Sequence, residues 1–124
     1  PSAGSSGRMW IFFVMDDRFH RSPNNSPEGP EKVMWGPAQL QWLKDGLVNS
    51  RAPFKIVANG NQVLNPISEF EALVNFKTEY DDLIAYIKKN RIPGVVFISG
   101  DRHMTELIRL QDTTPHVARI VDHW

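Results

Sequence analysis

The sequence feature that most constrains the fold is the segment of residues 94–103, G-V-V-F-I-S-G-D-R-H. Residues 95–98 form a short run of β-branched and aromatic side chains, which predicts a strand buried on both faces of an α/β sheet. Gly100 is expected to let the backbone turn sharply after this strand, where a Cβ atom would clash. The polar residues 101–103 follow at once, at the kind of strand end where α/β sheets bind ligands.

These polar residues carry side chains suited to metal and phosphate chemistry. Asp101 and His103 lie two positions apart, so in an extended segment both point the same way. A carboxylate and an imidazole are common ligands of first-row metals. Arg102 is a permanent cation suited to forked contacts with phosphate. The alternative is a local Asp–Arg ion pair beside a capping or surface histidine, because three-residue patterns recur by chance.

Two other apolar runs also end in polar clusters. Residues 9–15, M-W-I-F-F-V-M, predict a buried strand that leads into residues 16–18, D-D-R. Residues 54–58, F-K-I-V-A, predict a strand that leads into residues 59–62, N-G-N-Q, whose amides could bind a hard cation or donate to a phosphate oxygen. Strand ends are where α/β enzymes place their chemistry. Each cluster alone also fits an ordinary solvated turn.

The remaining elements complete an alternating order. One helix is expected to begin at Pro37 and end at residues 49–50, and another to begin at Thr78, which has capping-box spacing with Asp81, and to end at Asn90. Their apolar faces are formed by Ala38, Leu40, Leu43 and Leu47, and by Tyr80, Leu83, Ile84 and Ile87. Residues 22–32 and 64–77 are expected to be mostly loop, residues 106–110 and 117–121 strands, and residues 112–115 a turn. Helices alternating with buried strands predict an α/β layered sheet.

Composition narrows the function classes. The 124 residues suffice for one domain with a modest core. The 14 basic and 14 acidic residues give no net charge, which argues against a general nucleic-acid binder and against nucleic acid as a sequence-specific partner, while a local basic patch stays open. Cysteine is absent, so neither a disulfide nor a thiolate metal site is expected. No apolar stretch approaches the roughly 20 residues of a membrane span, no secretion signal is recognised, and residues 1–8 are expected to be a flexible linker or loop.

Four blocks of the chain resemble consecutive blocks of the PhoD-like alkaline phosphatases, within the metallophosphoesterase superfamily. They are M-D-D-R-F-H-R-S-P-N, G-P-A-Q-L-Q-W-L, A-P-F-K-I-V-A-N-G-N-Q-V-L and N-R-I-P-G-V-V-F-I-S-G-D-R-H-M-T-E-L, in the family's order. The resemblance implies a four-layer α/β/β/α sandwich, with residues 9–124 as the C-terminal portion of the phosphatase domain. His20 and Asn59 depart from the family's usual pattern, where an aromatic and a small residue often stand.

The same resemblance implies site residues and an activity. Asp101 and His103 would hold metal, and Arg18, Arg102 and His103 would act in catalysis. Asn61 and Gln62 would contact substrate. The implied reaction is hydrolysis of a phosphate ester by a metal-bound hydroxide, with calcium and iron as the metals the family suggests. Family members are often secreted or periplasmic.

The superfamily's earlier ligand blocks precede the matched region, so the chain resembles the C-terminal half of such an enzyme. Half of a two-metal centre has too few ligands, because both ions must be fixed about 3.5–4 Å apart. The chain is therefore expected to be inactive alone and to need the missing N-terminal half or an associating chain. One sheet face would also be left uncovered. Two alternatives stay open: a non-catalytic α/β binding module derived from a phosphatase fold, and an unrelated small α/β binding domain.

Overall fold

The computed structural model describes residues 7, 9–67, 71–111 and 114–118. The elements follow in the order β1 (Trp10–Val14), α1 (Pro37–Asn49), β2 (Phe54–Asn59), the 3₁₀ turn η2 (Leu73–Asn75), α2 (Lys77–Lys89), β3 (Val95–Ser99), β4 (Leu107–Gln111) and β5 (Thr114–Ala118). Most of the predicted linker, the first half of the predicted turn at 112–115 and the end of the predicted strand at 117–121 lie outside the described residues.

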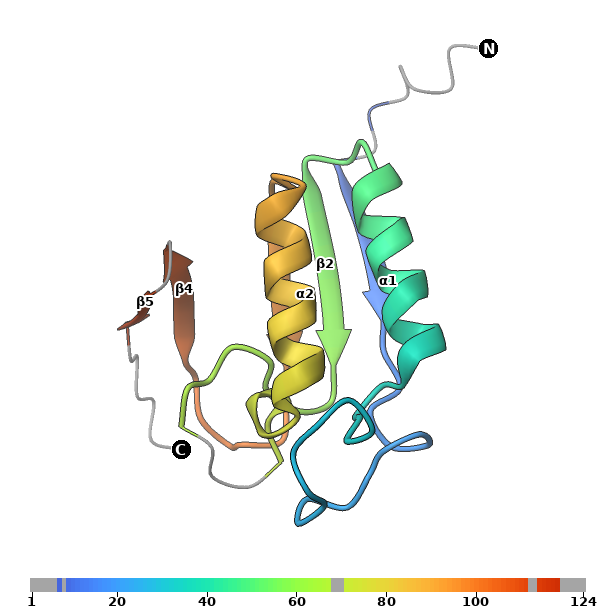
Figure 1. Cartoon of the computed structure of the whole chain (residues 1–124). Coiled ribbons are helices and arrows are strands. Elements are labelled where there is room, and N and C mark those ends of the chain that lie inside the picture. The colour runs from blue at the N-terminus through green and yellow to red at the C-terminus, as the bar shows by residue number, and fades with distance from the viewer. Residues whose placement is uncertain (1–6, 8, 68–70, 112–113, 119–124) are drawn as a thin grey trace.

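The three predicted apolar runs form one parallel sheet in the order β1-β2-β3. Parallel neighbours need a crossover, and α1 and α2 supply the two crossovers. Both helices pack on the same face of this sheet, and β1 and β2 point toward the same end of the molecule (Figure 1). The antiparallel hairpin β4–β5 is a separate sheet. The α/β prediction is therefore confirmed.

The core lies between the sheet and the helices. Leu40, Leu43 and Leu47 of α1 are buried, and they share a core with Phe13 of β1 and Val57 of β2. From α2, Leu83 is buried in this core, with Tyr80 and Ile87 packed against it. The apolar helix faces expected from spacing thus face the sheet. Ala38 is an exception, because its side chain is exposed.

The opposite face of the sheet is exposed and apolar. Trp10, Phe12 and Val14 point to it from β1, and Val96 and Ile98 from β3. Register places Phe12, Ile56 and Val96 side by side across the three strands. The prediction that these strands are buried on both faces is therefore wrong for the described structure. The physical reason is that alternate strand residues face opposite sides, and both helices cover the same side.

Two local predictions also need correction. The helix α2 begins at Lys77, and its N-cap residue Phe76 makes no side-chain capping bond, so the Thr78–Asp81 capping box does not form. Instead, Asp81 accepts a hydrogen bond from Lys77 Nζ one turn earlier, at 2.5 Å. Pro115 belongs to β5 and not to a turn.

Candidate active site

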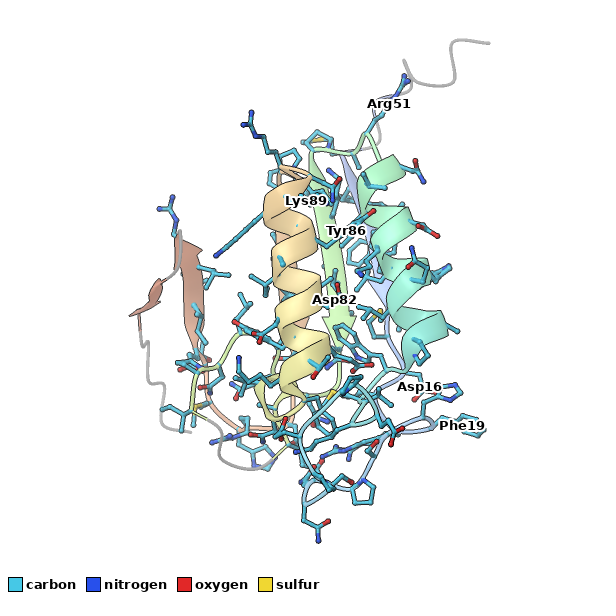
Figure 2. The ribbon with its side chains drawn as sticks, in the orientation of Figure 1. Asp16, Phe19, Arg51, Asp82, Tyr86 and Lys89 are labelled. Carbon is cyan, nitrogen blue, oxygen red and sulfur yellow. The ribbon has the colours of Figure 1, made fainter. Side chains whose placement is uncertain are left out.

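The carboxyl ends of the three parallel strands meet at one edge of the molecule. The Met15 N–H donates to the Ala58 carbonyl oxygen at 2.9 Å, and the Gly100 N–H donates to the Gly60 carbonyl oxygen at 3.2 Å. Pairing between neighbouring strands therefore continues into the polar segments that follow them. In Figure 2 Asp16, which directly follows this pairing, lies at the opposite end of the molecule from Arg51. The polar clusters noted in the sequence thus share one edge, where α/β sheets bind ligands.

Asp17 links the segment after β1 to the segment after β2. Its buried carboxylate accepts a hydrogen bond from the Asn61 backbone N–H, with Oδ2 at 2.6 Å. A Cβ atom on Gly60 would lie 2.8 Å from the same oxygen, so only glycine lets the two segments approach this closely. Asp16, by contrast, is exposed, and its Oδ1 accepts the N–H groups of Arg18 and Phe19. These backbone hydrogen bonds, that of Phe19 first, lower the pKa of Asp16.

Asn61 holds a buried side-chain amide that lacks a hydrogen-bond partner among the described residues. The residue is only 1% exposed, and neither its Oδ1 nor its Nδ2 has a partner there. An unsatisfied buried amide is costly, and such groups often mark a place for a water, an ion or a ligand. The amide of Asn59, two residues earlier, is satisfied: its Oδ1 accepts from Trp35 Nε1 at 3.0 Å and its Nδ2 donates to the Asn61 carbonyl oxygen at 2.8 Å.

Gln62 is directed to a different surface. Its Nε2 donates to Glu106 Oε2 at 3.1 Å, and its Oε1 accepts from Asn65 Nδ2 at 2.8 Å. Together with residues of α2, β3 and β4 it lines a mainly apolar cavity of about 570 Å³. The side-chain amide of Gln62 therefore already has protein partners, whereas that of Asn61 has none among the described residues.

The segment after β3 is bent and not extended as the sequence predicted. Asp101 and His103 both have left-handed backbones, with φ angles of 75° and 50°. Gly100 does not adopt a positive φ, and a Cβ atom on it would meet nothing within 4 Å, so the expected glycine turn is wrong. The Arg102 N–H closes the bend by donating to the Gly100 carbonyl oxygen at 3.0 Å. Left-handed backbone at non-glycine residues is strained and clusters at functional sites.

Arg18 lies among carboxylates at this edge. Its Nη1 donates to Glu71 Oε2 at 2.6 Å, and its Nε lies 4.0 Å from Asp17 Oδ1. The hydrogen bond that Arg18 donates to Glu71 is the main cause that raises the pKa of Arg18, and the negative charges of Asp17 and Asp101 add to it. The charge of Asp101, in the segment after β3, therefore acts on Arg18, in the segment after β1.

Sequence reasoning missed two carboxylates that shape this edge. Glu71, in a stretch interpreted as loop, pairs with both Arg18 and Arg21. Glu79, in the first turn of α2, is buried and accepts the backbone N–H groups of residues 34, 35 and 36 at 2.7, 3.1 and 2.8 Å. The contacts of Glu71 and of Glu79 join residues more than forty positions apart in the sequence, so no local sequence pattern predicts them. The acidic residue in the first turn of α2 was the one available signal.

The donor types at this edge fit a metal ion, but their number does not. A carboxylate from Asp101 and an imidazole from His103 are ordinary metal ligands, and the amide oxygen of Asn61 suits a hard cation. In the described part of the chain, however, no three His, Asp or Glu residues lie close enough together to hold one ion. Among the described residues, Asp101 and His103 are therefore two candidate ligands and not a complete metal site.

Comparison with known proteins places the chain in a family. Residues 4–121 match the family model of the PhoD-like phosphatases. The chain belongs to the PhoD-like phosphatase family. Alkaline phosphatase D of Bacillus subtilis (strain 168) is 24% identical over 115 residues, which cover 78% of this chain and 20% of that protein.

Solved structures agree on the fold. A structure of PhoD superposes with a TM-score of 0.67 at 22% identity, covering 79% of this chain and 22% of that one. The chain therefore spans about a fifth of the length of these two relatives. In the part of the chain that the structure describes, neither α1 nor α2 is long and apolar enough to cross a membrane.

Proposed function

We propose that this chain forms part of the active site of a metal-dependent phosphatase. Asp101 and His103 serve as metal ligands, Arg18 and Arg102 neutralise phosphate charge, and the amide of Asn61 contacts metal or substrate. Family membership supports the reaction class. The proposal of a site here rests on one observation: Arg18, Asp101 and the Asn61 side-chain amide, which has no hydrogen-bond partner among the described residues, lie at the same edge of the sheet.

A metal ion held by Asp101 and His103 would polarise a phosphoryl oxygen as a Lewis acid. Calcium and iron remain the proposed identities, from family resemblance. Arg18 is exposed enough to meet a substrate, and a guanidinium there offers a fork of donors that matches phosphate oxygens. His103 and Arg102 lie on the strained bend, which would hold their side chains in a defined direction.

We further infer that the purified 124-residue chain turns over little or no phosphate ester by itself. Two candidate ligands are too few for a two-metal centre, in which both ions must be fixed about 3.5–4 Å apart. Further ligands would come from the N-terminal half of a complete domain or from an associating chain.

The test is a turnover assay with a chromogenic phosphate monoester and diester, with calcium and iron added separately. We expect rates equal to those of buffer with metal. Turnover by the wild-type chain that His103→Ala abolishes and Asp45→Ala retains would contradict the partial-site proposal. It would show instead that this chain is sufficient for catalysis.

The exposed apolar sheet face favours a second candidate, a non-catalytic module that binds a partner through that face. Val14 is 74% exposed, and Trp10, Phe12, Val96 and Ile98 extend the same surface. Contiguous apolar patches of this kind mark interaction surfaces. A folded chain that binds no metal at Asp101 and His103 would favour the module over the phosphatase.

A further inference from the structure

Two arginines converge on a single carboxylate oxygen beside the candidate active site. Glu71 Oε2 lies 2.6 Å from Nη1 of Arg18 and 3.0 Å from Nη1 of Arg21. Both arginines come from the segment that follows β1. One oxygen atom therefore occupies the place where two guanidinium groups meet.

Glu71 satisfies the hydrogen-bonding capacity of the Arg21 guanidinium only in part. The Arg21 side chain is 9% exposed, and its guanidinium carbon lies 5.4 Å from the centre of the Phe76 ring. Its Nη2 donates to Asn24 Oδ1. Its Nη1 is buried and, among the described residues, makes no well-aligned hydrogen bond, although Glu71 lies within ion-pair distance. A buried cationic donor without a good acceptor is costly, so a better acceptor would stabilise this place.

A phosphate group is such an acceptor. It carries up to two negative charges and presents several oxygens in different directions, whereas Glu71 presents one oxygen to both arginines. Guanidinium forks bind phosphate through parallel charge-assisted hydrogen bonds. The place is open to solvent, because the side chains of Arg18 and Glu71 are 60% and 37% exposed. A ligand can therefore reach Arg18 and Glu71, and it would meet the buried Arg21 once it takes the place of the carboxylate.

We propose that Arg18 and Arg21 form a clamp for the phosphate group of a phosphate ester, and that Glu71 occupies this clamp when no phosphate is bound. The choice of phosphate as the ligand rests on the proposed function. Asp17, 4.0 Å from Arg18 Nε, and the nearby charge of Asp101 oppose an anion. We therefore expect weak binding by the wild-type chain and tighter binding once Glu71 loses its charge.

The test is a calorimetric titration of the full 124-residue chain with inorganic phosphate, in the presence of a chelator. Glu71→Gln keeps the shape of the side chain and removes its charge. We expect roughly fivefold tighter phosphate binding, since an exposed ion pair is worth up to about one kcal/mol. Asp45→Asn removes one negative charge from the exposed side of α1 and should leave the affinity within about twofold of wild type, because salt screens distant charges.

A second pair of variants tests the arginines. Arg18→Gln in the Glu71→Gln background should lose at least the affinity gained, and Arg51→Gln in the same background should retain it. Arg51 is a matched control, because it lies at the opposite end of the molecule (Figure 2). Arg18 is chosen over Arg21 because its exposed side chain can be replaced with little risk to folding. Circular dichroism confirms that each variant is folded.

Three results would overturn the proposal: no change in affinity for Glu71→Gln, equal losses for Arg18→Gln and Arg51→Gln, or no phosphate binding by any variant. Because the chelator removes metal, none of these results depends on metal binding at Asp101 and His103. If the chain binds phosphate as expected but does not bind metal, the clamp proposal stands and the proposed metal site at Asp101 and His103 is rejected. The two proposals thus fail separately.

Discussion

Asp17 is the residue on which the geometry of the candidate site depends most. Its buried carboxylate accepts the Asn61 N–H at 2.6 Å and lies against Gly60, so it fixes the segment after β2 to the segment after β1. Arg18 follows it directly and Asn61 is its partner. A change at Asp17 therefore reaches both candidate site residues.

We expect Asp17→Ala to lower the free energy of unfolding by about 2 kcal/mol, because it leaves a buried backbone N–H without an acceptor. Urea unfolding followed by tryptophan fluorescence measures this. Asp45→Ala, an exposed helix position, is the control and should change stability by less than about 0.5 kcal/mol. Equal effects of the two substitutions would show that the Asp17–Asn61 contact contributes nothing.

Glu71 predicts a dependence of stability on pH. Its hydrogen bond with Arg18, together with the charge of Arg21, lowers its pKa below the ordinary value of 4.5. A carboxyl whose folded pKa is depressed contributes stability that is fully present above the unfolded pKa and is lost as the pH falls through the folded pKa. Wild type should therefore lose stability below about pH 4.5.

Glu71→Gln should lose less stability over the same acid range, because its amide does not titrate. Urea midpoints between pH 3 and pH 6 check this. Parallel curves for wild type and Glu71→Gln would mean that the ion pairs of Glu71 do not stabilise the fold.

At the scale of elements, the glycines that flank β3 play unequal parts. Gly94 precedes the strand with a φ of 67°, and a Cβ atom on it would lie 1.8 Å from the Pro53 carbonyl oxygen. The same Gly94 carbonyl accepts the Lys55 N–H at 2.8 Å, which aligns β3 with β2. Gly100, at the other end, has open space around it.

Gly94→Ala should therefore cost about 3 kcal/mol or more, from left-handed strain and a backbone clash together. Gly100→Ala should be close to neutral. Thermal unfolding of both variants beside wild type measures the difference. A larger loss of stability for Gly100→Ala than for Gly94→Ala would contradict the structure. It would support the glycine-dependent turn after β3 that the sequence predicted.

Sequence patterns predicted the elements well for a clear physical reason. Apolar runs such as residues 54–58 and the helical spacing of Leu40, Leu43 and Leu47 are local signals, and burial follows from them. Which strand face is covered depends on where the crossover helices lie, so a local pattern could not show that Phe12 and Val96 are exposed. The bend at residues 101–103 was missed because left-handed non-glycine residues have no reliable sequence signal.

The roles of the candidate site residues stay predictions, but the common edge at which they lie could be predicted from the sequence. Three polar strand ends pointed to one edge, and the structure brings Arg18 and Asp101 near each other there. The partners of these residues were not predictable, because Glu71 and Arg18 are separated by 53 positions. Such contacts depend on the tertiary fold and not on spacing.

At the scale of the whole molecule, the three-stranded sheet leaves one apolar face exposed. The chain belongs to the PhoD-like phosphatase family and spans about a fifth of the length of two relatives, and Trp10, Phe12 and Val14 lie on the uncovered face. Covering that face would remove apolar surface from water, which is the main driving force for association.

The most direct test of the central claim is the metal content of the purified chain, measured by inductively coupled plasma mass spectrometry after incubation with calcium and iron and removal of free metal. We predict bound metal in wild type, loss of it in both Asp101→Ala and His103→Ala, and retention in Asp45→Ala. Metal that binds equally to all four proteins, or to none of them, would contradict the assignment of Asp101 and His103 as metal ligands.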